Sequence, residues 1–236
     1  MPAEPGTACW AELDVEDPEA VLPFYAAVLG WSFDPPDEAG VVARRDGVAV
    51  AALGVPGVAT PPAWTVHLAA DDVDAAAEHC EELGGQLLHG PEDDERGARV
   101  LFALDAGGAV VGLRESDDEV PAPAPGMLVG AEAASAEPGT TRTFHGALLG
   151  YRFGATSDGA PDHTACLGAA GEPLAGIGFA GDALPHWLPV FAVADVDAAV
   201  AAAREAGGAV VAPASAARPA TLADPAGAPF GVTVRS

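Results

Sequence analysis

The residues that could bind or transform a small molecule lie on two strand-like segments in the first part of the chain. Alternation in CWAELDV places Trp10 and Glu12 on one side of a strand, and alternation in WTVHLAA does the same for Thr65 and His67. An indole face attracts aromatic and cationic groups, a partly buried carboxylate pairs with an amine, and histidine supplies a base near neutral pH. These side chains therefore predict either a binding site for an aromatic cation or a site for acid–base chemistry.

The sequence offers no competing catalytic motif. It has no Ser-His-Asp or Cys-His arrangement, no glycine-rich phosphate loop and no nucleic-acid motif at a credible spacing. Its three cysteines (Cys9, Cys80 and Cys166) are too few and too scattered for a disulfide framework or a Cys-rich zinc site. They favour a reduced, intracellular setting.

The elements that must position the candidate residues follow from the same patterns. Strands are predicted over 9–15, 41–45, 48–54, 64–70, 86–90, 98–104 and 109–115. Asp17-Pro18-Glu19 predicts the start of a helix that ends at Gly30, and Asp71 or Asp72 caps a second helix that runs to Gly84-Gly85. Two strands follow the first helix and three follow the second, and we interpret the first half of the chain as two modules of order βαβββ.

The second half repeats the first. DPEAVLPFYAAVLGWSF aligns with EPGTTRTFHGALLGYRF, so that Phe24 lies over Phe144, and WTVHLAADDVDAAAEHCEELGG aligns with WLPVFAVADVDAAVAAAREAGG. The repeat predicts an α+β fold of four βαβββ modules in two domains, 1–118 and 127–236, joined by the acidic, Pro-rich linker 119–126. It leaves open which modules pair, and therefore whether the chain has one cavity or two.

Composition narrows the class of partner. The 236 residues include 35 acidic and 10 basic side chains, all of the latter Arg, for a formal net charge of −25. Such a charge repels nucleic acid and anionic membranes and favours cationic small molecules. No signal peptide and no apolar run of about 18 residues is visible, so we expect a cytoplasmic protein without a membrane segment.

The modules resemble the vicinal-oxygen-chelate superfamily, which includes glyoxalase I, extradiol dioxygenases and bleomycin-resistance proteins. The resemblance rests on FYAAVLGW in the first module and DDVDAAAEHCEELGG in the second, and PGTACW is similar to the first strand of fused two-domain actinobacterial members. It covers nearly the whole chain and implies sheets that curve around a cavity, with the helices outside. The superfamily contains both enzymes and pure binders, so the fold alone does not decide the function.

The resemblance also implies where a metal would be held, and this sequence departs from that pattern. Family spacing assigns the ligand positions to residues that are poor or impossible side-chain ligands: Trp10, Thr65 and Gly112 in the first half, and Gly130, Leu188 and Gly231 in the second. A shift of two residues along each strand gives Glu12 and His67, but also Arg114, whose positive charge opposes a divalent cation. We therefore predict no metal and no other cofactor.

Strand alternation then predicts the residues that face the cavity. Trp10 and the acids Glu12 and Glu132 would hold an aromatic cation against small or apolar walls. The predicted ligand-binding residues are Trp10, Glu12, Thr65, His67, Val110, Gly112, Arg114, Glu132, Leu188, Val190 and Thr233, with Gly130, Gly231 and Arg235 on the same faces.

Two functions remain open on these grounds. The first is a metal-free protein that sequesters a hydrophobic, cationic aromatic natural product or antibiotic, for self-resistance or as an accessory in biosynthesis. The alternative is a metal-independent enzyme, an isomerase or a hydroxylation accessory, with His67 as base and Glu12 orienting it. Either would act on a small molecule as a monomer or a homodimer.

Overall fold

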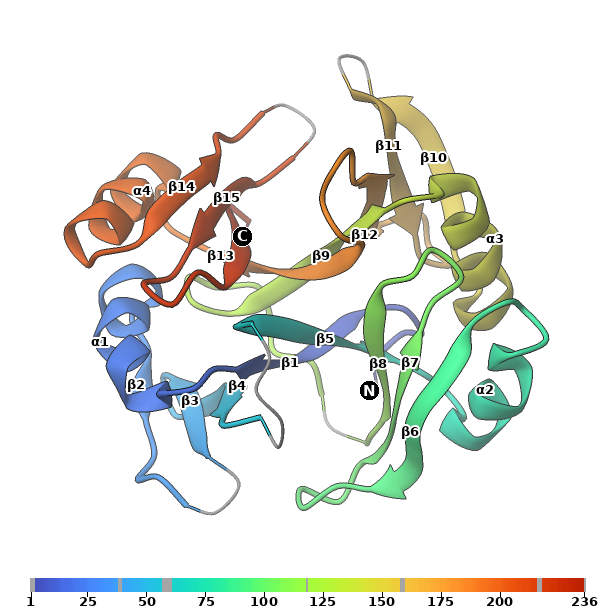
Figure 1. The fold of residues 1–236 in the computed structure, drawn as a ribbon, viewed down its shortest axis with the longest axis horizontal. Coiled ribbons are helices and arrows are strands. Elements are labelled where there is room, and N and C mark those ends of the chain that lie inside the picture. Colours follow the sequence, from blue (N-terminus) through green and yellow to red (C-terminus); the bar gives the residue numbers. More distant parts are fainter. Residues whose placement is uncertain are drawn as a thin grey trace. The chain divides into compact units, whose positions relative to one another are not determined.

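The computed structural model describes residues 3–37, 40–56, 61–117, 119–157, 160–215 and 218–235. These residues form four helices and sixteen strands, and the strands belong to two eight-stranded sheets (Figure 1). The predicted α+β class and the βαβββ order of all four modules are confirmed. Within the described residues, no helix is both long enough and apolar enough to span a membrane.

Each module contributes one strand, one helix and three further strands, in that order. The first module consists of β1 (Ala8–Asp14), α1 (Pro18–Leu29), β2 (Ser32–Phe33), β3 (Val41–Arg45) and β4 (Val48–Gly54). The second consists of β5 (Ala63–Ala69), α2 (Val73–Cys80), β6 (Gln86–Asp93), β7 (Arg99–Leu104) and β8 (Val110–Glu115). The third consists of β9 (Leu128–Ser135), α3 (Pro138–Leu149), β10 (Arg152–Ser157), β11 (Ala160–Leu167) and β12 (Pro173–Phe179). The fourth consists of β13 (His186–Ala192), α4 (Val196–Glu205), β14 (Ala209–Ala212), β15 (Ala220–Ala223) and β16 (Pro229–Thr233).

Every module arranges its strands in the same order. The four groups run β2-β3-β4-β1, β5-β8-β7-β6, β10-β11-β12-β9 and β13-β16-β15-β14. The strand before each helix pairs in parallel with the last strand of its module, and the other pairs are antiparallel. Each helix therefore covers one face of its four strands, and we call the opposite face the open face.

The helices begin and end where their capping residues require. Asp17 Oδ1 accepts from the Ala20 N–H at 3.2 Å, Pro18 follows at the first helical position, and Gly30 ends α1 in the left-handed conformation at φ 68°. Asp72, not Asp71, caps α2 by accepting from the Ala75 N–H at 2.8 Å. The prediction for the end of α2 is wrong by four residues, because the helix stops at Cys80 and the chain continues as turns to Gly84.

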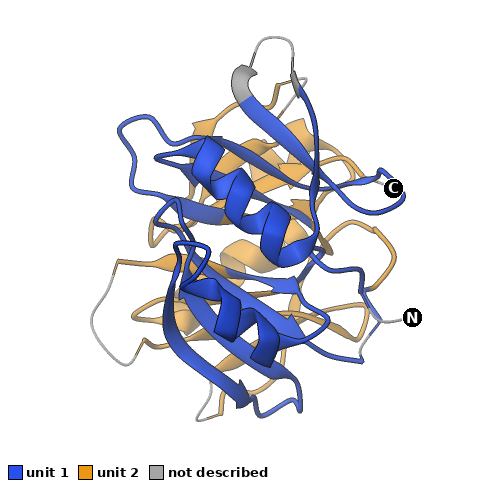
Figure 2. Ribbon diagram, turned by 90° about the vertical axis from the view of Figure 1, so that its right-hand side faces the viewer, with its two compact units in different colours: residues 1–9, 66–120, 130–187 blue, residues 10–65, 121–129, 188–236 orange. Residues whose placement is uncertain are grey.

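Packing divides the chain into two compact units that do not follow the halves of the sequence. Unit 1 comprises residues 1–9, 66–120 and 130–187, and unit 2 comprises residues 10–65, 121–129 and 188–236 (Figure 2). Unit 1 contains α2 and α3 in contact, and unit 2 contains α1 and α4 in contact. Through these helix contacts the second module pairs with the third, and the first pairs with the fourth. The sequence repeat alone did not show which modules pair. The predicted boundaries at 118 and 127 stay a prediction.

The repeated double glycines explain part of this packing. In unit 1 Gly84 adopts φ 89°, and a Cβ on Gly85 would lie 2.7 Å from Phe144 Cε2 and 2.8 Å from Leu104 O. In unit 2 Gly207 and Gly208 repeat both features, with Phe24 in place of Phe144. The first glycine of each pair makes the turn, and the second leaves room for the ring from the partner helix.

Candidate functional site

The open face of β5–β8 in unit 1 collects a polar and aromatic group around Phe102. His67 on β5 lies beside Gly112 on β8, and Gly112 is opposite Phe102 on β7. The His67 and Phe102 rings meet edge to face, with centroids 5.1 Å apart and planes at 79°. A Cβ on Gly112 would lie 2.5 Å from His67 Nδ1, so only glycine leaves room for the imidazole. His67 is 1% exposed, whereas Phe102 is half-buried.

A charged pair borders this group two residues further along β8. Arg114, which is 6% exposed, donates from Nη1 to Asp94 Oδ2, and its Cα partner on β7 is Val100. Burial alone would raise the pKa of Asp94, but hydrogen bonds from Arg114 and from the Ala98 and Arg96 N–H groups hold that pKa below its ordinary value. Asp94 therefore stays ionised and fixes the guanidinium in place.

An exposed pair of side chains on β6 lies at the border of the same group. His89 Nε2 lies 2.7 Å from Glu92 Oε1, and the His89 ring centroid lies 6.3 Å from that of Phe102. Both side chains are more than half exposed. We define the open-face site of unit 1 as His67, His89, Phe102, Asp94 and Arg114. Of these, the sequence predicted only His67 and Arg114. The alternation of RVLFAL could have pointed to Phe102, but no pattern in the sequence links Asp94 to Arg114.

The predicted ligand-binding residues of the first strand lie in unit 2. Trp10 is 6% exposed, and its Nε1 donates to Glu12 Oε1 at 3.1 Å, which confirms that the two side chains share a face of β1. Burial, and after it the Glu12 charge, raise the pKa of Asp14 two residues on. Thr65, which belongs to the same unit, is half-buried. In unit 1, Val110 is 39% exposed at the start of β8.

The second half places a different pair on its open face. His163 on β11, which is 4% exposed, lies with Nε2 2.7 Å from Glu132 Oε2 on β9. A Cβ on Gly176, between them on β12, would lie 2.5 Å from His163 Nε2. Among the described residues nothing hydrogen-bonds to the buried His163 Nδ1. The sequence predicted Glu132 but not His163, because register shifts between β10 and β11 hide which residues of β11 share its face.

The remaining predicted residues of the second half lie in unit 2 and are mostly apolar. Val190 is 6% exposed and is the register partner of Gly231, where a Cβ would lie 3.0 Å from Val190 Cγ2. Arg235 donates to the backbone carbonyl of Val129. Leu188 and Thr233 are half-buried. Among these side chains, only Arg235 and Thr233 offer polar groups.

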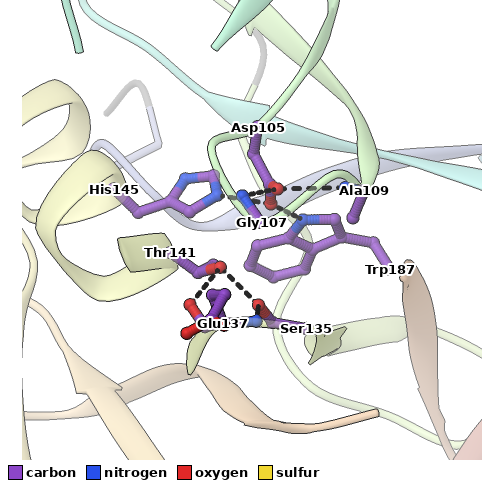
Figure 3. A network of polar contacts seen from close by, with 8 residues as sticks. All are labelled: Asp105, Gly107, Ala109, Ser135, Glu137, Thr141, His145 and Trp187. Atoms are coloured by element: carbon purple, nitrogen blue, oxygen red, sulfur yellow. Dashed lines mark hydrogen bonds and ion pairs between the residues drawn. The ribbon is translucent and has the colours of Figure 1, made fainter. Parts of the chain in front are cut away.

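A third polar group lies on the helix side of unit 1 and is fully buried. Asp105 Oδ2 accepts from Trp187 Nε1 at 3.1 Å and lies 3.1 Å from His145 Nε2, while Oδ1 accepts from the Gly107 and Ala109 N–H groups (Figure 3). Burial would raise the pKa of Asp105, but these hydrogen bonds and the His145 charge bring it below its ordinary value.

This buried carboxylate has a counterpart in unit 2. Tyr25 donates to Asp224 Oδ2 at 2.9 Å, and Asp224 Oδ1 accepts from the Ala226 and Ala228 N–H groups. Because the arrangement recurs where the helices of each unit meet, and its members are buried, it holds the cores together and does not form a ligand site.

Comparison with solved structures defines the fold class. The chain superimposes on the Mn(II)-bound glyoxalase from Novosphingobium aromaticivorans with a TM-score of 0.71 and 15% identity, covering 98% of this chain and 83% of that one. The 2,3-dioxygenase LapB from Pseudomonas sp. KL28 gives 0.69 and 13%, covering 99% and 92%. The predicted vicinal-oxygen-chelate fold is confirmed.

Sequence comparison then gives the family. The model of the glyoxalase-like domain matches residues 10–121 and 130–233. The chain therefore belongs to the glyoxalase-like family, and it contains two tandem copies of the glyoxalase-like domain. It is 34% identical to the putative glyoxylase CFP32 of Mycobacterium tuberculosis, over 96% of this chain and 94% of that protein. It is 33% identical to the anthracycline biosynthesis protein DnrV of Streptomyces peucetius, over 97% and 93%.

The donor set of this chain does not fit a metal of the glyoxalase type. Five of the six positions that family spacing assigns to ligands carry Trp, Gly or Leu, which donate no side-chain oxygen, sulfur or imidazole nitrogen to a metal, and the sixth is Thr65. Across the described ranges, no three His, Cys, Asp or Glu side chains gather closely enough to hold an ion. The side chain nearest to Gly112 is instead that of His67.

Proposed function

We propose that this chain binds an aromatic natural product without a metal, on the open-face site of unit 1. The observation that carries the proposal is the group of His67, Phe102 and the Arg114–Asp94 pair. It offers a partly exposed ring for stacking beside a fixed guanidinium whose donors suit phenol, quinone or carboxylate oxygens. Rings and a few convergent polar groups on one sheet face are typical of sites for small aromatic ligands.

The relatives support a role in the chemistry of natural products. One of them is named as an anthracycline biosynthesis protein, and anthracyclines are polycyclic aromatic compounds. A ligand with a positive charge would also be concentrated by the net charge of −25. We therefore propose sequestration of such a compound, for self-protection or as an accessory step in its biosynthesis.

The experiment is a fluorescence titration, checked by native mass spectrometry, with daunorubicin and with its neutral aglycone. Phe102→Ala should weaken the binding of both compounds about tenfold, because one stacked ring is lost. Phe179→Ala is the matched control, since Phe179 is 51% exposed at the end of β12 and lies outside the proposed site. Glu92→Gln, which removes the charge beside His89 on β6, should weaken daunorubicin more than the aglycone if an amine is recognised.

Two results would contradict the proposal. Equal losses in Phe102→Ala and Phe179→Ala would show that the open-face site does not hold the ring. A protein purified with a stoichiometric metal would show that the family-type positions have been replaced by other ligands. The alternative enzyme stays a prediction, and turnover of a bound compound that disappears in His67→Ala would establish it.

A further inference from the structure

Unit 1 has a cavity of about 630 Å³ on its helix side, away from the open-face site. It lies between α2, the C-terminal end of α3 and the segment that precedes β1. Its apolar wall is formed by Ala75, Ala76, Leu83 and Leu148. A volume of this size suits a small organic molecule.

Unit 2 shows what the corresponding place holds in the other copy of the repeat. There, Arg45 at the end of β3 reaches the C-terminal end of α1. Its Nη1 donates to Gly30 O at 2.9 Å, and its Nε donates to Pro125 O at 3.0 Å. A guanidinium at this point neutralises the negative end of the helix dipole, which no basic residue in the last turn of α1 does.

Strand register identifies the position equivalent to Arg45 in unit 1. Ser32 pairs with Arg44 in the first copy, and Arg152 pairs with Leu167 in the second, so Gly168 occupies the place of Arg45. The two carbonyl residues are also repeated. Gly150 ends α3 as Gly30 ends α1, and Pro5 precedes Gly6 as Pro125 precedes Gly126, with both glycines at φ above 80°. Gly150, Pro5 and Gly168 all line the cavity.

The charge around Gly168 in unit 1 is negative, whereas the charge at Arg45 in unit 2 is positive. Glu4 lies where unit 2 has Ala124, and its Oε1 accepts from the Ala169 N–H. A Cβ on Gly168 would lie 2.8 Å from both Glu4 oxygens and 2.6 Å from Glu172 Oε1, so two carboxyl groups converge over a missing side chain. Glu172 is half-buried, and its carboxyl group hydrogen-bonds to that of Glu4.

Further negative groups line the cavity, and the basic side chain among its lining residues is His79, whose Nδ1 lies 2.7 Å from Ala75 O. Asp71 and Asp72 are exposed in its lining, and α3, like α1, has no basic residue in its last turn. Arg152 donates to Gly168 O and Ala169 O and is not part of the lining. The negative end of α3 therefore faces the cavity.

We propose that this cavity is a second ligand site, which binds an organic cation with a guanidinium or primary ammonium group and an apolar body. The cationic group occupies the place that Arg45 fills in unit 2, between Gly150, Pro5 and the Glu4 carboxylate. The apolar body lies against α2. This site is independent of the ligand proposed for the open face.

The experiment measures binding of hexylguanidinium to the full chain by calorimetry at low salt, with hexylurea as the neutral probe of the same shape. We expect one site for hexylguanidinium and affinity at least about tenfold above that for hexylurea, because charge-assisted hydrogen bonds are lost in the urea. Gly168→Arg should abolish binding, since its side chain would supply the missing guanidinium. Its Cβ meets only the flexible ends of Glu4 and Glu172.

Arg45→Gly gives a reciprocal test, because it should open the equivalent place in unit 2 and raise the stoichiometry from one to two. Glu4→Gln should weaken binding several-fold, whereas Glu78→Gln, an exposed acid on α2 outside the lining, should not. Phe102→Ala should also leave it unchanged, which separates this site from the open-face site.

Equal affinity for hexylurea and hexylguanidinium would overturn the proposal. So would unchanged binding in a Gly168→Arg variant whose circular dichroism and melting temperature show that it is folded. If Arg45→Gly does not fold, the binding of hexylguanidinium by Gly168→Arg and by the parent chain still tests whether the cavity is the site.

Discussion

Asp105 is a buried acid whose ionisation contributes to the stability of unit 1. Its carboxylate is 3% exposed and accepts from Trp187, from two backbone N–H groups and from His145. A carboxylate held in this way contributes to stability only while it carries its charge.

We therefore predict that Asp105→Asn lowers the free energy of unfolding at pH 7 by about 1–3 kcal/mol. The folded pKa of Asp105 lies below its ordinary value of 3.8. Its contribution is therefore fully present above the unfolded pKa and is lost as the pH falls through the folded pKa. Urea unfolding from pH 7 to pH 2.5 should show the gap between parent and variant closing below about pH 4.

Asp71→Asn serves as the control for this prediction, since Asp71 is exposed and does not cap α2. A gap for Asp105→Asn that stays constant down to pH 2.5 would mean that shape, not charge, explains the loss.

Single residues also mark the limit of prediction from the sequence. Alternation correctly placed Trp10 with Glu12 on one face, because the period of a strand is fixed. The partners Asp94 for Arg114 and His163 for Glu132 were not predictable. The first lies at the end of a hairpin, and the second depends on a register that is shifted between β10 and β11.

At the level of elements, the pattern predicted β3, β4 and the end of α1 at Gly30 correctly. It missed β2, ended β6 at residue 90 instead of Asp93, and misplaced the end of α2. β3 and β4 coincide with the predicted ranges 41–45 and 48–54, because Asp46-Gly47 is a two-residue turn between alternating segments. The end of α2 was placed at Gly84, but the chain leaves the helix at Cys80 through turns such as Gly84 N–H to Glu81 O. A turn-rich helix end with no glycine at its cap gives no signal in the sequence.

The double glycine after α2 provides a prediction about how elements pack. Gly85→Ala should lower the free energy of unfolding by about 1–3 kcal/mol, since the added methyl group would meet Phe144, Leu104 O and Cys80 Sγ. Thermal unfolding of Gly85→Ala and of the equivalent Gly208→Ala should show similar losses. Gly154→Ala is the control, because Gly154 also lacks a positive φ and a Cβ there would come no closer than 3.6 Å to another atom.

An unchanged free energy of unfolding in Gly85→Ala would show that the ring of Phe144 can move aside without loss of stability. A loss in Gly154→Ala as large as that in Gly85→Ala would show that the close contacts of the added methyl group are not its cause.

For the whole molecule, the composition of the two units predicts how its halves behave. Residues 1–118 alone would contain α2 without α3 and α1 without α4, so each helix would expose the side that packs in the intact chain. We predict that 1–118 and 127–236, expressed separately, form homodimers or aggregate, and that mixing them gives a 1:1 complex. Light scattering after size exclusion measures the molar mass of each half and of the mixture. Two stable monomers that do not associate on mixing would contradict the prediction.

The sharing of each helix-side core between the two halves also constrains how this duplicated gene can evolve. Gly85 from one half accommodates Phe144 from the other, and Gly208 accommodates Phe24 in the opposite sense. A recombination event at the linker would join halves that have no history of packing together, so most such hybrids would carry mismatched ring and glycine positions. We therefore expect the two copies to evolve together. A substitution at one of these positions should be accompanied by a compensating substitution at its contact partner, about 60 or 180 residues away along the chain.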